Sequence, residues 1–441
     1  MGPVVNRIFL LFGLVFMLPV LSGCSSHVAY DTLEQHLAQG DCNAASELMA
    51  ASESDYGENA ALLFLLDSAM VDMQCRRFGP AQEKFRAAED LAEALWTLSL
   101  SREAATYLTN EYVQSYAGED FERAMIHLMS ALAFLEQGLP EEALVECRRL
   151  DTLLAMFSDK YQGENGYRED AFARYLSGIL RQGDRDPGGA FIDYKKALDA
   201  YTLGEDNYGI VPEDLKASLF RAAQKAGRPA DALAALPGYR APSGPEDTAA
   251  VGQVVWIRLR GRVPPKTEKR ITLPSPHGPL IVAFPGYGPR SSPEPEFPLT
   301  LRSETGEIVT KPAVLVSNIS AVAVAALEDK RGRITAKALA RAAAKQVLIQ
   351  QVTKNKDKEK ERVAENILNI INLFIERADL RSWRSLPGQI YMARFYLPAG
   401  NWYAEGKKLL VKAGEIRYIV VNDAWGGPSN EPSETRDSIH P

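Results

Sequence analysis

The side chains best suited to chemistry in this sequence are four cysteines and five histidines. They are Cys24, Cys42, Cys75 and Cys147, and His27, His36, His127, His277 and His440. Their spacing contains no CxxC pair and no Cys/His set typical of zinc sites. No GxSxG, HExxH or Walker-type loop occurs, and in the second half of the chain a Ser-His-Asp arrangement could use only His277. We therefore expect no catalytic residue, no metal and no cofactor.

Cys24 stands at the end of a segment typical of secretion. The run from Ile8 to Leu21 carries no charge; it is too short for a transmembrane helix of roughly 20 residues but fits the apolar part of a signal peptide. Leu21-Ser22-Gly23-Cys24 resembles the bacterial lipobox, in which the cysteine is lipidated and the chain is cut before it. The resemblance implies a signal peptide over residues 1–23 and acyl chains on Cys24, enough for firm membrane anchoring. The alternative is a cysteine that follows an ordinary signal by chance.

The residue after Cys24 bears on the membrane involved. An aspartate there would resemble a signal for retention in the inner membrane, but the residue is Ser25. We therefore expect the outer membrane, with the protein facing the periplasm. Disulfides are permitted in that compartment.

Length and charge limit the class of protein. Removing residues 1–23 from the 441 leaves 418, enough for two or three domains. The removed segment holds Arg7 and no acid, so the net charge would change from −7 to −8. An acidic chain argues against general nucleic-acid binding, although local basic patches remain possible.

The first half of the chain, from about Asp31 to Leu236, reads as pairs of helices. A glycine precedes an alanine by five residues three times, at Gly40/Ala45, Gly138/Ala143 and Gly227/Ala232. Two further segments share spacings of 12, 4 and 3 residues: Ala69, Ala81, Phe85 and Ala88, and Gly178, Ala190, Tyr194 and Ala197.

These spacings are typical of tetratricopeptide (TPR) repeats, in which a small residue lets two helices approach closely. The alanines Ala45, Ala81, Ala143, Ala190 and Ala232 lie 36, 62, 47 and 42 residues apart, so the repeats are irregular, with extra helix around Thr97–Tyr116. We predict a TPR-like α-solenoid over residues 24–236, whose concave surface would bind a protein partner.

The remaining thiols and His127 have structural interpretations. Cys42 and Cys75 fall near the tips of successive hairpins, so they could form a disulfide; two free thiols are the alternative. A bridge would require Cα atoms within about 7 Å. Cys147 falls where such repeats bury an aromatic side chain, and His127 lies on an apolar helix. We expect both to be packed in the core.

After a linker over residues 237–252, the composition becomes β-rich. Runs such as "VVWIRLRG", "PLTLRS" and "QIYMARFYLP" predict strands, and "KKLLVKAGEIRYIVV" predicts a hairpin about Ala413-Gly414. Two helices are expected within this part, at Ile334–Val352 and Lys358–Glu376. We predict an α+β domain over residues 253–425, sandwich-like, and a disordered tail over residues 426–441.

Two features of the second half could form sites. Arg333, Lys337, Arg341 and Lys345 recur every four residues and would form one basic stripe on a helix. The stripe is either a solvated face or a contact for an anionic lipid, glycan or acidic partner. Asp379, Arg381 and Trp383 form the second feature; we expect a structural corner, with Arg381 paired locally and Trp383 packed against the sheet.

Two long segments carry a family resemblance. The segments "AGEDFERAMIHLMSALAFLEQGLPEEALVECRRLDTLL" and "ADLRSWRSLPGQIYMARFYLPAG" resemble a bacterial family of TPR-containing outer-membrane lipoproteins, with similarity from the lipobox to about Asp423. The resemblance implies location and architecture but no assigned activity.

Together these features predict a lipid-anchored periplasmic scaffold that binds protein partners through its repeats. An accessory activator of a cell-wall or surface-polymer synthesis machine is one alternative, and an enzyme acting on envelope glycans is the least favoured. The identity of the partners and the oligomeric state do not follow from the residues.

The lipobox makes a direct prediction about Cys24. Cys24→Ser should prevent lipidation, because the acceptor thiol is removed, and should leave uncleaved precursor or release the protein from the outer-membrane fraction. Membrane fractionation and intact mass measure both effects, and Ser25→Ala serves as the neighbouring control. Unchanged processing and fractionation of Cys24→Ser would contradict the anchor.

Overall fold

The computed structural model describes residues 29–102, 114–161, 167–204, 209–240, 250–273, 280–288, 292–353 and 378–426. Cys24, the expected signal peptide and residues 427–441 of the expected tail lie outside the described residues. Within the described part, no helix combines the length and the apolar character needed to cross a bilayer.

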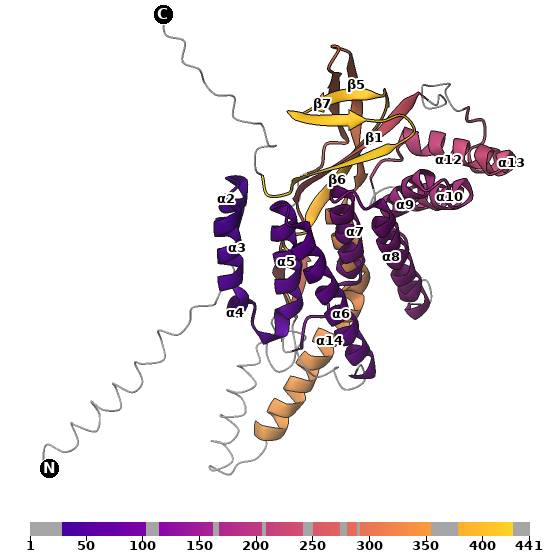
Figure 1. Cartoon of the computed structure of the whole chain (residues 1–441). Helices are drawn as coiled ribbons and strands as arrows, with labels where there is room; N and C mark the ends of the chain where they lie inside the picture. The colour runs from indigo at the N-terminus through magenta and orange to yellow at the C-terminus, as the bar shows by residue number, and fades with distance from the viewer. Residues whose placement is uncertain are drawn as a thin grey trace, which may run out of the picture.

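The first half consists of helix pairs (Figure 1). The first helices of the pairs are α2 (Tyr30–Ala38), α5 (Ala61–Gln74), α7 (Asp120–Glu136), α9 (Ala171–Gly183) and α12 (Glu213–Lys225). Their second helices are α3 (Cys42–Ala51), α6 (Phe78–Arg102), α8 (Pro140–Lys160), α10 (Pro187–Leu203) and α13 (Pro229–Ala235). Short turns α4 (Glu53–Tyr56) and η1 (Glu58–Ala60) precede α5.

The repeat spacing seen in the sequence corresponds to packing positions. All five alanines that anchor the second helices, Ala45, Ala81, Ala143, Ala190 and Ala232, are fully buried. At Gly178 of α9, an added Cβ would lie 2.4 Å from the ring of Tyr194, so only glycine allows α10 to approach this closely. The helical half is therefore TPR-like, as predicted.

The hairpin tips share one backbone feature that the glycine pattern showed only in part. Gly40, Gly138 and Gly227 have positive φ angles of 73°, 74° and 72°. In the other two hairpins the equivalent residues, again five before the anchor alanine, are Arg76 and Arg185, with φ of 57° and 59°. The left-handed region favours glycine, so these two arginines hold a strained conformation.

The second half contains one seven-stranded sheet, in the order β8-β7-β4-β5-β6-β1-β9. Its strands are β1 (Val251–Arg262), β4 (Glu296–Ser303), β5 (Ile308–Ser317), β6 (Pro387–Pro398), β7 (Gly400–Ala404), β8 (Lys407–Val411) and β9 (Ile416–Asp423). A separate ribbon pairs β2 (Lys266–Leu273) with β3 (Leu280–Tyr287). The expected linker over residues 237–252 overlaps the first two residues of β1, and its residues 241–249 lie outside the described part.

The sheet differs from the expected sandwich because it curls on itself. The segment after β8 reaches the start of β1, where Gly414 N–H donates to Val251 O at 2.9 Å. Gly252 permits this approach, since a Cβ there would lie 2.2 Å from Lys412 O. The predicted hairpin about Ala413-Gly414 is wrong: β8 pairs with β7, and β9 pairs in parallel with β1, at the other end of the strand order.

Both faces of the central strands are buried. In β1, Val254 and Trp256 point into the core enclosed by the sheet, whereas Val255, Ile257 and Leu259 belong to the large core that it shares with the helices. At the far end, Trp425 packs with α2 and α3. The predicted helical and β-rich domains are therefore joined through continuous cores.

Helix α14 (Ile319–Thr353) begins fifteen residues before the expected Ile334. Asn318 marks its start, because its side chain accepts from Ala321 N at 3.1 Å. The helix packs against α7, β3 and β6, and Lys330 forms ion pairs with Glu119 at 2.8 Å and Asp120 at 3.3 Å. The second expected helix, Lys358–Glu376, lies outside the described residues.

All five first helices carry polar side chains that bond to the C-terminal half, and the first of them is Glu34 of α2, which pairs with Arg262 of β1. Asp67 of α5 accepts from Ser385, and Glu122 and Glu136 of α7 accept from the backbone N–H groups of Trp383 and Val420, both at 2.8 Å. In the last two pairs, α9 and α12 meet a single cation, Arg394 of β6. These bonds fix the sheet on the first-helix side of the repeats (Figure 1).

The Arg394 side chain has no exposed surface and is fully bonded. It donates to Asp214 at 3.1 Å, to Ser218 at 2.8 Å, to Gln182 at 2.9 Å and to Gln253 at 2.6 Å. Burial by itself raises the pKa of Asp214, but Arg394 outweighs this effect, so the pKa lies below its usual range.

Arg394→Met should lower the free energy of unfolding by about 3 kcal/mol at neutral pH, because it leaves Asp214 without its cation. The ion pair stabilises the folded state fully at pH values above the ordinary aspartate pKa of about 4. This stabilisation is lost as the pH falls through the lower pKa that Asp214 has in the folded state. The difference between wild type and variant should therefore shrink in acid. Urea unfolding at several pH values measures this. Arg417→Met, at an exposed arginine of β9, is the control. An equal loss of stability in this variant would contradict the stabilising role of Arg394.

Candidate functional site

The surface expected to bind partners is already occupied. In the sequence-based interpretation, the stacked repeats would offer a concave surface to a protein partner. In the structure, α7 lies against β9 and α9 lies against β5, and the side chains between them form one core. The first-helix side is therefore covered by the sheet, whereas the side of the second helices is not part of this core.

A groove on that side lies between α6, α7 and α8 and has a volume of about 400 Å³. We call it the outer groove. It is lined by Glu89, Ala92, Glu93, Trp96, Thr97, Arg123, Ile126, His127, Val145, Arg148, Arg149, Thr152, Leu153 and Met156.

The outer groove exposes apolar surface. Trp96, Ile126 and Leu153 contribute to its lining, and Val145 and Met156 of α8 are 49% and 36% exposed. Apolar side chains that are exposed together in a concave site are typical of protein-binding surfaces. Methionine adds a flexible, polarisable surface that adapts to different partners.

Arg123 is the buried cation of the groove. It is 5% exposed, and its guanidinium lies 5.0 Å from the ring centroids of both Trp96 and Phe157. Burial lowers the pKa of Arg123. Its Nη1 has no hydrogen-bond partner in the described part of the chain. A buried donor without an acceptor costs about 1–3 kcal/mol, which an acceptor from a ligand would recover.

His127 is buried between carboxylates, in agreement with a packing role. Its Nδ1 lies 2.8 Å from Glu146 Oε2, and its Nε2 lies 3.8 Å from Glu89 Oε1. Arg149 bridges the same two carboxylates at 2.9 and 3.3 Å. Both ring nitrogens thus face acids of the protein itself, and the network forms a charged wall of the outer groove.

The predicted cysteine pair is joined in the structure. Cys42, the first residue of α3, and Cys75, at the end of α5, form a disulfide with a Cα–Cα distance of 5.6 Å. Cys147 is a buried free thiol, and burial raises its pKa well above the usual value. A buried thiol of raised pKa is chemically inert.

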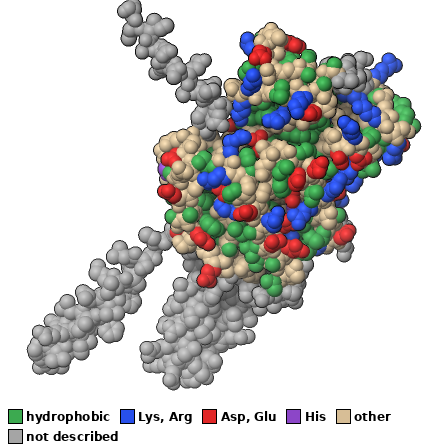
Figure 2. Space-filling model, viewed as in Figure 1, with side chains coloured by type: hydrophobic (Ala, Val, Ile, Leu, Met, Phe, Trp, Pro, Cys, Tyr) green, Lys and Arg blue, Asp and Glu red, His purple; other side chains and the backbone are tan. Residues whose placement is uncertain are grey.

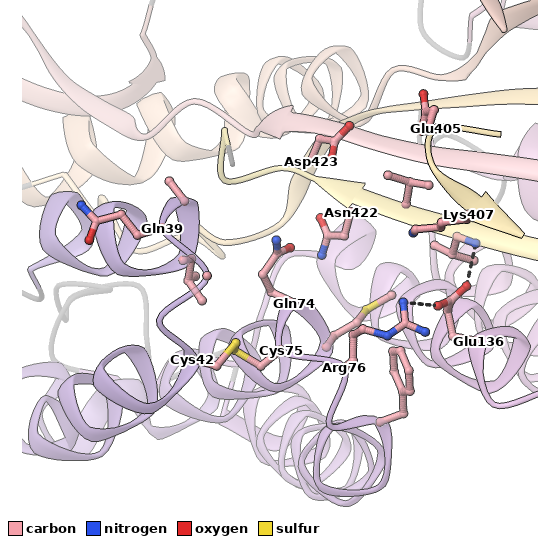
Figure 3. A pocket seen from close by; sticks show the side chains of 17 residues that line it. Gln39, Cys42, Gln74, Cys75, Arg76, Glu136, Glu405, Lys407, Asn422 and Asp423 are labelled. Carbon is pink, nitrogen blue, oxygen red and sulfur yellow. Dashed lines mark hydrogen bonds and ion pairs between the residues drawn. A yellow bond between two sulfur atoms is a disulfide. The ribbon is translucent and has the colours of Figure 1, made fainter. Parts of the chain in front are cut away.

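A polar cavity of about 290 Å³ lies beside the disulfide (Figure 3). Gln74 and Asn422 point toward one another across it, and their Oε1 and Nδ2 atoms are buried with no partner in the described part of the chain. Arg76, at the strained hairpin tip, pairs with Glu136 at 2.9 Å. Arg76 and Glu136 thus satisfy one another, and the polar atoms left to bond are the amide atoms of Gln74 and Asn422. A cavity with such atoms suits ordered water.

The two predicted features of the second half have different outcomes. Arg381 bonds to Asp379 at 2.7 Å and to the carbonyls of Asn59 and Gln114, so this segment is a structural corner. Trp383 packs beside Phe85 of α6, and its ring belongs to the core shared with the helices. The positions of the basic stripe, Arg333, Lys337, Arg341 and Lys345, all lie in α14, but their side chains lie outside the described residues.

No group of three or more His, Cys, Asp or Glu side chains is placed to hold a metal ion within the described residues. The sequence analysis missed the outer groove, because its residues come from three helices whose relative placement the sequence does not define. The signals present were the apolar exposed positions of α8 and a charged residue, Arg123, within an apolar helix.

Two of the solved structures that are similar to this chain contain helical repeats. BtubC (BKLC) from P. vanneervenii matches with a TM-score of 0.30 and 17% identity, over 48% of this chain and 80% of that one. A putative kinesin light chain from Podosopora anserina with nearly identical TPR-like repeats matches with a TM-score of 0.30 and 13% identity, over 48% and 93%. No family model and no curated protein matches the sequence.

The cysteine assignments predict a simple labelling pattern. With Cys24 lipidated, iodoacetamide should label no cysteine in the native protein, Cys147 alone after unfolding without reductant, and Cys42, Cys75 and Cys147 after unfolding with reductant. Mass spectrometry of the peptides measures this. Labelling of Cys42 or Cys75 without reductant would contradict the disulfide.

Proposed function

We propose that the protein is a lipid-anchored scaffold of the cell envelope that binds a partner protein through the outer groove. The observation that carries the proposal is a contrast between two faces of the repeats. The first-helix face is filled by the protein's own sheet, whereas the outer groove keeps exposed apolar side chains and a buried arginine whose Nη1 has no hydrogen-bond partner among the described residues. The lipobox at Cys24 supports the anchor and the envelope location.

The chemistry of the outer groove defines the segment that it would bind. Val145 and Met156 favour apolar side chains, and Arg123 favours a carboxylate or carbonyl oxygen placed beside them. We infer that the occupant is a short apolar segment of a partner protein that carries an acidic residue. Such a contact uses apolar burial for affinity and the arginine for orientation.

Site-specific crosslinking tests the proposal. A photo-crosslinking amino acid at position 145 or 156 should give one discrete adduct in the native envelope, because both positions face the groove. The same amino acid at Ile192, which is 47% exposed on α10, should not give it. Equal adducts at all three positions would contradict the groove.

Binding of the identified partner then measures the contribution of each feature. Val145→Asp and Met156→Asp should each weaken binding about tenfold or more, since each removes roughly 1–3 kcal/mol of apolar contact. Arg123→Met should weaken binding of the acidic segment and leave binding of a segment with the acid replaced by its amide less affected. Ile192→Asp is the control and should bind as wild type does.

The identity of the captured partner decides between the two remaining interpretations. A synthase of cell-wall or surface polymer would make the protein an accessory activator, whereas a structural envelope protein would make it a general scaffold. Turnover of glycan by the purified protein would instead favour the enzyme and contradict the expected lack of catalysis.

A further inference from the structure

The polar cavity beside the disulfide contains two unsatisfied amide atoms that face one another. Its lining comes from the tips of the first two hairpins, the end of α7, the β7–β8 turn and the end of β9. Gln74, the last residue of α5, and Asn422 of β9 point toward one another across it (Figure 3). Gln74 Oε1 and Asn422 Nδ2 are both buried without a hydrogen-bond partner in the described part of the chain. An acceptor and a donor thus lie on opposite sides of the same space.

Both carboxamides are carried by fixed positions. Asn422 Oδ1 accepts from the backbone N–H of Ala424 at 3.2 Å, which leaves Nδ2 for the cavity. Gln74 precedes Cys75, and the disulfide to Cys42 ties the end of α5 to the start of α3. Ordered water can bond to both amide atoms, and a ligand group that reproduces both bonds can take its place. That group must accept from Asn422 and donate to Gln74.

The charged groups around the polar cavity balance one another. The carboxylates of its lining are Glu136, Glu405 and Asp423, and its cations are Arg76 and Lys407. Arg76 pairs with Glu136 at 2.9 Å, and Arg258, outside the lining, bonds to the other two carboxylates. Three carboxylates therefore meet three cations. Figure 2 likewise shows acidic and basic side chains interspersed over the helical repeats. No net charge is left at the cavity to select an ion, so the chemistry favours a neutral ligand.

The edge of β9 presents further backbone donors and acceptors to this space. In the order of the described sheet β9 is the last strand, paired with β1. Val420 N–H points away from β1, because it donates to Glu136 Oε1 at 2.8 Å. Backbone groups alternate in direction along a strand, so the N–H and C=O of Asn422 also point away from β1. An extended peptide beside Asn422 would meet backbone groups as well as the two carboxamides.

The apolar part of the lining favours a peptide over a sugar. Sugar rings pack against open aromatic faces, and Phe78 is the aromatic residue among those that line the described cavity. Its ring has the Arg76 guanidinium 5.5 Å from the centroid and packs against the core, so its surface is already used. Leu37, Met73 and Val421 supply aliphatic surface instead. Such a lining suits a small apolar side chain.

We propose that the polar cavity binds one peptide unit of an extended, neutral segment of a partner protein. In a trans peptide unit the C=O and N–H groups point in opposite directions, which matches a donor and an acceptor that face one another. The C=O accepts from Asn422 Nδ2, and the N–H donates to Gln74 Oε1. The volume of about 290 Å³ is near the lower end of the range for ligand sites and admits about two residues with small side chains. The site shares no residue with the outer groove.

Ligand-observed NMR with the full mature chain in detergent tests the proposal. The probe is N-acetyl-alanine N-methylamide, which should bind with a Kd of about 1–10 mM, as is usual for so small a ligand. N-acetylproline dimethylamide keeps the carbonyls but has no N–H, and should bind about tenfold more weakly. N-acetylglucosamine presents an acetamido group on a sugar and should bind more weakly than the alanine probe. Added salt should leave binding unchanged, because no ion pair forms.

Two variants locate the bound probe. Gln74→Met should weaken binding about tenfold while the melting temperature stays the same or rises, because the atom removed had no partner. Asn422→Asp has the same shape and keeps the bond to Ala424 N–H, but it replaces the donor by an acceptor and should weaken binding similarly. Gln35→Met, at an exposed glutamine of α2, is the matched control and should bind the probe as the wild type does.

Three results would overturn the proposal. The first is that the alanine probe does not bind at concentrations up to about 50 mM, which would leave the cavity to water only. The second is that N-acetylglucosamine binds more tightly than the alanine probe, which would make the cavity a sugar site. The third is that Gln74→Met, folded as the wild type, binds the probe with unchanged affinity.

Discussion

The structure depends on polar side chains that the repeat helices bury and cannot satisfy by themselves. Asp67 lies in the middle of the apolar helix α5, is fully buried, and accepts from Tyr30, Tyr56 and Ser385. Glu122 is 1% exposed and accepts from Trp383 N–H. Without the C-terminal half, each of these carboxylates would lose a donor, and an unpaired buried charge costs several kcal/mol. The repeats and the sheet therefore stabilise one another, unlike the self-sufficient stack that a TPR pattern suggests.

This mutual dependence determines which surfaces remain for binding. Because the sheet fills the first-helix side, the surfaces left are the outer groove on α6, α7 and α8 and the cavities where hairpin tips meet strands. The outer groove offers apolar area and one buried cation, Arg123, whose Nη1 has no hydrogen-bond partner among the described residues. This combination is consistent with the proposed scaffold.

Much of the helical half could be predicted from the sequence, because helix packing requires side chains of particular size at fixed spacings along the chain. Ala143 or Gly178 can be recognised as a close-contact position, since no larger side chain fits between two helices. The same signal disappears where arginine replaces glycine at a hairpin tip, so Arg185 could not be recognised as equivalent to Gly138. The strands were also recognisable from their alternation, but strand order was not, because the parallel pairing of β9 with β1 joins residues far apart in the chain.

The contact between the two halves left only an indirect signal in the sequence. Asp67 and Glu122 are charges within apolar helices, a pattern that indicates a buried partner without identifying it. The partner of Asp67, Ser385, lies 318 residues away, and Arg394 lies 180 residues from Asp214. No local pattern encodes contacts of that separation, so both the filled first-helix face and the cavities at its border required the structure.

Arg394 shows how the two halves of the fold depend on one another. It holds the sheet against α9 and α12, and the same bonds orient the carboxamides of Gln182 and Gln253. This network of buried donors and acceptors is therefore assembled only when the two halves are docked. A ligand that binds the docked arrangement and not the separated halves stabilises the docked form by mass action. Ligand binding at the border between the sheet and the repeats and attachment of the sheet to the repeats are, on this reasoning, two linked equilibria.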